Sequence, residues 1–290
     1  MSRFILSCTT CATRAIDGDE TAACFRYAPR AGFRAWGIAS VAQRALGEAR
    51  WLDAGKLRGA ALAVGLRRCT EVYAPAFPAD SEAAAAAAAE QMASVFALAV
   101  GLQSPLVVMT GGMSAAQAAA IRDGLASAPR RGRIRSVGLA APIAGIKRLL
   151  PLVEHLPVRL ALEPHHGSNF SVRADFDRIF SEIDHPKVGI TIDTGHFHRS
   201  EVDWRSFIRA YGDKIWNLHV KDHRGPVSVP LGSGEVDLRG YLEELHAIDY
   251  DGPLALELEV EDPENLPRYV CDAHAYLSRL VREVTGNDPG

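Results

Sequence analysis

The feature that most constrains the fold is a regular alternation of short apolar or β-branched runs with longer stretches of helical periodicity. This order of elements is typical of parallel βα units. The candidate strands number about eight and span residues 4–7, 34–38, 69–73, 106–109, 158–162, 188–192, 215–219 and 254–258. No linker or shift in composition divides the chain. We therefore expect one α/β domain over residues 1–290, folded as a closed (β/α)8 barrel rather than an open sheet.

Helix signals lie between the strands. Ser81 is a candidate N-cap for an alanine-rich helix, and Asp237 is a candidate N-cap for a helix over 238–248. The least regular part is 114–156, where helices near 115–126 and 143–155 are separated by a Pro-Arg-Arg-Gly-Arg break. We interpret this part as one enlarged βα unit.

Charge and composition exclude several classes of partner. The net charge is −3 and no long run of like charges occurs, so neither nucleic acid nor an anionic membrane is expected to bind. No uninterrupted apolar stretch is long enough to span a bilayer. The first 13 residues hold too short an apolar stretch for a secretory signal, and the five cysteines are scattered. These features predict a cytoplasmic protein.

Four consecutive candidate strands each end in a potential metal ligand: Glu163, Asp193, His219 and Glu257. In a (β/α)8 barrel, functional side chains lie at the carboxyl ends of the strands. Carboxylates gathered at an apolar barrel mouth lose hydration and repel one another unless an opposite charge compensates. Their recurrence predicts a site for one divalent ion, with Mn²⁺, Mg²⁺, Co²⁺ and Zn²⁺ all compatible with oxygen and nitrogen ligands.

Each of these residues also has a simpler interpretation. A single strand-end Asp or Glu is commonly a helix cap or a salt-bridge partner, and His219 alone could be a core histidine. Glu259 lies on the same side of its strand as Glu257 by two-residue alternation, so it is a rival for the last ligand position. We favour Glu257.

Several segments resemble the sugar phosphate isomerase/epimerase family, the xylose isomerase-like TIM barrels. The similarity follows the strand order over the whole chain, but its motifs are specific only from about residue 158 onward. The matching segments are Leu162-Glu163-Pro164, Asp193-Thr194-Gly195-His196, His219-Val220-Lys221-Asp222, Gly232-Ser233-Gly234-Glu235-Val236-Asp237 and 250–257.

The resemblance implies one divalent metal ion bound by Glu163, Asp193, His219 and Glu257. It also implies that Glu163 and Glu257 are catalytic and exchange the proton on the carbon beside a ketose carbonyl. Elementary chemistry agrees, because a metal acidifies that C–H bond and stabilises the enediolate, and two carboxylates on opposite faces can give and take the proton. The expected enzyme is an isomerase or epimerase of carbohydrate metabolism that acts on a small sugar, ketose or polyol derivative.

Further residues are candidates for binding the substrate. His196 matches the family histidine that contacts substrate hydroxyl groups. Lys221 and Arg224 follow the seventh strand and could hold a hydroxyl, carboxylate or phosphate group. His165, with His166 beside it, is unusual for its loop and could mark a distinct substrate. For each of them a solvated or backbone-bonded loop side chain is the alternative.

Other functions remain open at this stage. A lyase or dehydratase of a keto-sugar or keto-polyol could use the same metal site, because the same intermediate can expel a hydroxyl group. An abasic-site endonuclease is disfavoured. Endonucleases with this barrel need extra zinc-binding histidines after the third and fourth strands and an Asp-x-His motif after the seventh. Residues 73–75, 109–112 and 227–230 occupy those places and contain no such ligands. A non-catalytic binding barrel is the fourth reading. The resemblance also implies that the protein forms a homodimer or homotetramer.

Overall fold

Each predicted apolar run forms a strand, and the eight strands are parallel and close into a ring. The computed structural model describes residues 4–14, 16, 19–39, 52–74, 82–112 and 138–290. The strands are β1 (Ile5–Thr9), β2 (Ala35–Ile38), β3 (Arg68–Tyr73), β4 (Leu106–Thr110), β5 (Arg159–Glu163), β6 (Val188–Asp193), β7 (Ile215–Val220) and β10 (Pro253–Leu256). Their order around the ring is β1-β10-β7-β6-β5-β4-β3-β2. The predicted closed (β/α)8 barrel is confirmed.

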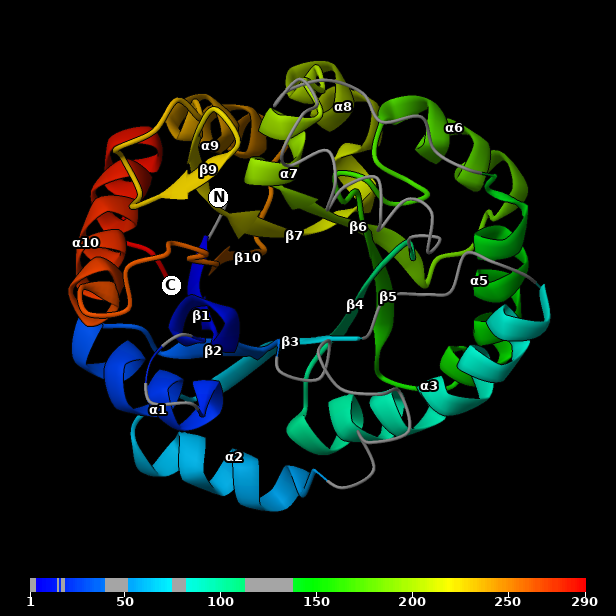
Figure 1. The fold of residues 1–290 in the computed structure, drawn as a ribbon, viewed down its shortest axis with the longest axis horizontal. Coiled ribbons are helices and arrows are strands. Elements are labelled where there is room, and N and C mark those ends of the chain that lie inside the picture. The colour runs from blue at the N-terminus through cyan, green and yellow to red at the C-terminus, as the bar shows by residue number, and fades with distance from the viewer. Residues whose placement is uncertain (1–3, 15, 17–18, 40–51, 75–81, 113–137) are drawn as a thin grey trace.

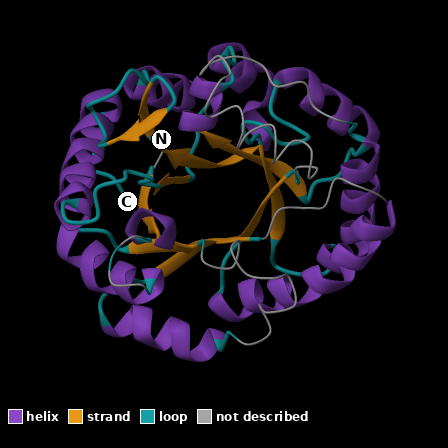
Figure 2. Ribbon diagram, viewed as in Figure 1, coloured by secondary structure: helices purple, strands orange, loops and turns teal. Residues whose placement is uncertain are grey.

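Helices surround this ring on the outside (Figures 1 and 2). They are α1 (Glu20–Ala31), α2 (Ala54–Ala63), α3 (Glu82–Leu102), α5 (Ala140–Val153), α6 (Arg173–Glu182), α7 (Thr194–Arg199), α8 (Trp204–Tyr211), α9 (Leu238–Ala247) and α10 (Leu266–Thr285). The predicted cap Ser81, the helix near 115–126 and the break after it lie outside the described residues. The second helix of that enlarged unit is α5.

Local sequence explains where the helices begin and which face they bury. Asp237 caps α9 as predicted, because its carboxylate accepts the backbone N–H of Gly240 at 2.9 Å. Helix α10 buries apolar side chains that recur every three or four residues, among them Val270, Leu277 and Val281. None of the helices in the described ranges is long and apolar enough to cross a membrane.

Strand register brings the candidate ligands to one level of the barrel. Asp193 pairs directly with His219 between β6 and β7, and His219 pairs with Ala255 between β7 and β10. Glu257 follows β10 and donates its backbone N–H to Val220 at 3.1 Å. Because parallel strands place their carboxyl ends at the same rim, the four side chains converge there.

A hairpin that follows β7 was not predicted. After β7 the chain forms a short antiparallel hairpin from β8 (Asp222–Arg224) and β9 (Val227–Val229). Figure 1 shows this hairpin beside α9, outside the ring of parallel strands.

Candidate active site

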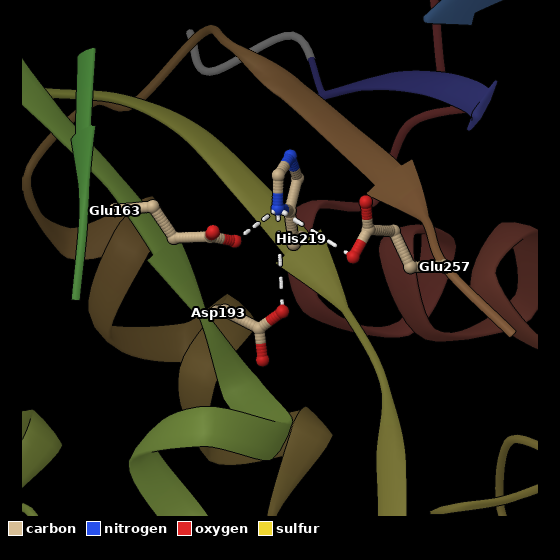
Figure 3. Close-up of side chains that lie close together, drawn as sticks. All are labelled: Glu163, Asp193, His219 and Glu257. Atoms are coloured by element: carbon tan, nitrogen blue, oxygen red, sulfur yellow. Dashed lines mark hydrogen bonds and ion pairs between the residues drawn. The ribbon is translucent and has the colours of Figure 1, made fainter. Parts of the chain in front are cut away.

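Glu163, Asp193, His219 and Glu257 form one buried group at the carboxyl ends of β5, β6, β7 and β10. One ligand atom from each lies within 4.8 Å of those of the others, and the described residues contain a single group of this kind. The Nδ1 atom of His219 lies 2.6 Å from Glu163 Oε1, 3.7 Å from Glu257 Oε2 and 4.0 Å from Asp193 Oδ2. In Figure 3 the two glutamates approach the imidazole from opposite sides, with Asp193 between them.

Asp193 is fixed in the group by the helix that follows it. Its Oδ1 accepts the backbone N–H of His196 at 2.7 Å and so caps α7. Its Oδ2 is thereby turned toward His219 and toward the ammonium group of Lys221.

The other nitrogen of His219 faces a carboxylate that sequence reasoning missed. Glu71, in β3, is fully buried and has its two oxygens 3.1 and 3.0 Å from His219 Nε2. It also accepts a hydrogen bond from the Asn217 amide. A glutamate in the middle of a strand, between Thr70 and Val72, was the available signal, because a buried glutamate needs a partner.

Tyr73, two residues further along β3, holds Glu163. Its hydroxyl donates to Glu163 Oε2, while Glu163 Oε1 faces His219. The Tyr73 ring stacks near that of His219, with centroids 5.7 Å apart. Tyr73 thus lies against both His219 and Glu163.

Lys221 lies inside the acidic group rather than on a solvated loop. Its side chain is 3% exposed, and its Nζ lies 3.0 Å from Asp193, 2.9 Å from Glu257 and 3.1 Å from Glu259. Burial opposes its charge, but the three carboxylates outweigh burial and raise the pKa of Lys221 well above its usual value. Lys221 therefore carries the positive charge that these acids require.

The two glutamates differ in their electrostatic surroundings. Burial raises the pKa of Glu257 to about 7. Burial also acts on Glu163, but the adjacent His219 outweighs it and lowers the Glu163 pKa. For His219, burial is outweighed by the carboxylates of Glu257, Glu71 and Glu163, which raise its pKa.

The donor set fits a divalent cation. Three carboxylates and one imidazole nitrogen converge from four strands, and oxygen with nitrogen ligation suits Mn²⁺, Mg²⁺, Co²⁺ or Zn²⁺. Glu257 belongs to this group and Glu259 does not, because the Glu259 side chain is 41% exposed and bonds to Lys221.

Two of the three candidate histidines lie beside the acidic group. His196 is buried, with Nε2 3.9 Å from Asp193 Oδ2, and its ring lies 3.6 Å from that of His165 between centroids. Burial lowers the pKa of His196 well below its usual value. His166 points elsewhere and bonds through Nδ1 to Ser200 at 2.9 Å. The structure thus brings His196 and His165 to the site's edge.

Arg224 is not brought to this group. It is exposed on the hairpin, and its guanidinium donates to the backbone oxygen of Ser233. The nearby glycine-rich turn is held from within the chain, because the N–H groups of Gly232 and Gly234 donate to Asp222 at 2.9 and 2.8 Å.

Solved structures share this fold. A D-allulose 3-epimerase from Methylomonas sp. is 18% identical, with a TM-score of 0.73, and the match covers 97% of this chain and 99% of that one. The IOLI protein, solved with a bound zinc atom, is 14% identical, with a TM-score of 0.73 and coverage of 98% and 100%.

Among curated proteins, the inosose dehydratase of Geobacillus thermodenitrificans is 28% identical over 166 residues, which are 50% of this chain and 54% of that protein. The chain spans about half the length of the curated relatives it matches. The family model described as xylose isomerase-like TIM barrel matches residues 25–280. A ring of eight parallel strands and a family match over most of its length together place this chain in the xylose isomerase-like TIM-barrel family.

Proposed function

We propose that this protein is a divalent-metal-dependent isomerase or epimerase of a small sugar, ketose or polyol derivative. The observation that carries the proposal is the opposed placement of Glu163 and Glu257 about His219 (Figure 3). Glu163, Asp193, His219 and Glu257 would hold the ion. When bound, the ion would polarise a substrate carbonyl and so acidify the adjacent C–H bond.

The chain's own residues would then move the proton. One glutamate removes it from the carbon beside the carbonyl, and the other returns a proton on the opposite face, which inverts the configuration. The Tyr73 hydroxyl holds one glutamate and the Lys221 ammonium holds the other. His196 and His165 lie where they could bind substrate hydroxyl groups.

The first test combines metal analysis with proton exchange. We expect about one divalent ion per chain in the purified protein, and loss of that ion in a Glu163→Gln, His219→Ala double variant. With ketoses and keto-polyols in deuterated water, the parent should place deuterium on the carbon beside the carbonyl. Glu182→Gln, an exposed change of the same type on α6, is the control and should retain both properties. A parent that binds no metal after reconstitution would contradict the proposal.

A dehydratase is the second candidate, because the curated relatives that the chain matches include inosose dehydratases. Elimination would begin with the same proton removal but would end with loss of a β-hydroxyl group. Mass spectrometry of the products separates the two reactions: an epimer keeps the substrate's composition, whereas a dehydration product has lost one water.

A further inference from the structure

The feature that the proposed reaction leaves unexplained is the carboxylate of Glu71 inside the barrel. Glu71 is on β3, four strands around the ring from β7, and is fully buried. Both of its oxygens lie within 3.1 Å of His219 Nε2, and the Asn217 amide donates to one of them. The carboxylate therefore reaches across the barrel to one specific nitrogen.

The neighbouring strand leaves room for this contact. Gly37 on β2 pairs with Glu71, and a Cβ atom at Gly37 would lie 2.7 Å from Glu71 Cγ and 2.9 Å from its Oε1. Any other residue at position 37 would push the carboxylate from its present position. The absence of a side chain here is thus coupled to the orientation of Glu71.

The chemistry of imidazole gives the contact a role. A neutral histidine has one N–H donor and one lone pair, and the hydrogen bond made by one nitrogen decides which is which. A carboxylate accepts hydrogen bonds, so Nε2 carries the proton opposite Glu71. Nδ1 faces Glu163, Asp193 and Glu257, the carboxylates proposed to hold the ion, so in the metal-bound protein the lone pair would be on Nδ1 and the single proton on Nε2.

We infer that Glu71 is a positioning residue that holds the proton of His219 on Nε2 and so presents Nδ1 as the ligand atom. This inference rests on the proposed metal site and adds a residue to it. Partners of metal-bound histidines typically change metal affinity about 10- to 100-fold when removed. A merely structural role would instead lower stability and leave the affinity of the folded protein unchanged.

The test uses the full chain with Zn²⁺ alone as the probe. Affinity is measured by competition with a chelator, and the protonated ring nitrogen is identified by ¹⁵N NMR of histidine-labelled, Zn²⁺-loaded protein. We expect Glu71→Leu to weaken Zn²⁺ binding about 10- to 100-fold and to shift the ¹⁵N resonance of Nε2, because that N–H loses its acceptor. Glu71→Gln keeps an oxygen acceptor and should retain the tautomer with a smaller loss of affinity.

Val72→Ala is the matched control, since Val72 is buried on the same strand between Glu71 and Tyr73. It should lower the unfolding midpoint without changing Zn²⁺ affinity or the tautomer. If Glu71→Leu does not fold, Gly37→Ala displaces Glu71 without altering it and should weaken Zn²⁺ binding in the same way.

The outcomes separate this inference from the proposed function. Unchanged affinity and an unchanged Nε2 resonance in Glu71→Leu would overturn the inference even if the wild type exchanges protons with its substrate. Zn²⁺ binding that depends on Glu71, without any proton exchange across the substrate panel, would support the inference and contradict the reaction. A wild type that binds no Zn²⁺ would overturn both.

Discussion

At the scale of single residues, Lys221 offsets much of the acidic charge at the barrel mouth. Its ammonium group lies about 3 Å from oxygens of Asp193, Glu257 and Glu259. In the metal-free protein this contact and the His219 imidazole compensate carboxylates that are buried away from water. Removal of one buried partner leaves the others uncompensated.

We expect Lys221→Met to destabilise the metal-free protein by about 3 kcal/mol, because the buried acids lose a counter-charge while the methylene packing is largely kept. A divalent cation should restore more stability to this variant than to the wild type. Urea unfolding with EDTA and with Mn²⁺ measures both effects. Equal losses in the two conditions would contradict the role given to Lys221.

The pKa of Glu257 predicts how metal binding depends on pH. Burial raises this pKa to about 7, so at pH 6 most metal-free molecules carry a proton there. Metal ligation needs the carboxylate, and the affinity should fall as the pH drops through 7. Protonation of the buried Glu257 carboxyl group stabilises the metal-free fold. This contribution is fully present below about pH 4.5 and is lost as the pH rises through 7.

Titration calorimetry at pH 6, in buffers with different ionisation enthalpies, measures this proton release. At pH 6 the observed heat of metal binding should vary with the buffer, because the buffer takes up the proton that Glu257 releases. Above pH 7 this variation should diminish, because Glu257 no longer carries that proton. A buffer-independent heat at pH 6 would show that no proton is displaced.

At the scale of elements, Asp222 organises the chain between β7 and α9. Its carboxylate accepts the backbone N–H groups of Gly232, Gly234 and Val236 at 2.9, 2.8 and 3.2 Å. A Cβ atom at Gly234 would lie 2.1 Å from Asp222 Oδ1, so the turn needs glycine there. This one side chain therefore holds the turn that links the β8–β9 hairpin to α9.

We expect Asp222→Ala to destabilise the protein by about 2 kcal/mol or more, since several partly buried N–H groups lose their acceptor. Hydrogen exchange should accelerate at the amides of Gly232 and Gly234. The exposed Asp184→Ala is the matched control and should change neither stability nor these exchange rates appreciably. Unchanged protection at both glycines would contradict the role of Asp222.

The strands were predictable because each is a short apolar run, and no boundary of the eight strands differs from its prediction by more than two residues. The hairpin β8–β9 was not, because Asp222–Arg224 and Val227–Val229 carry no such run. Their pairing depends on a local turn and on the Asp222 contacts, which leave no periodic pattern in the sequence.

At the scale of the whole molecule, the candidate metal ligands could be predicted, but the contact by which Glu71 holds His219 could not. Glu163, Asp193, His219 and Glu257 come at the ends of consecutive ring strands, so fold and strand order suffice to bring them together. The contact of Glu71 with His219 crosses the interior between strands four places apart. Such a contact depends on side-chain reach and on the missing side chain at Gly37, which strand patterns do not contain.

The order of strands also sets when the site can exist. Glu257 follows β10, the last of the eight strands in the chain, and β10 lies between β7 and the first strand, β1. A chain still emerging from the ribosome would therefore expose three of the four ligands on an unfinished ring. If the group binds a divalent ion as proposed, the complete set of four ligands would form only after β10 has joined the ring.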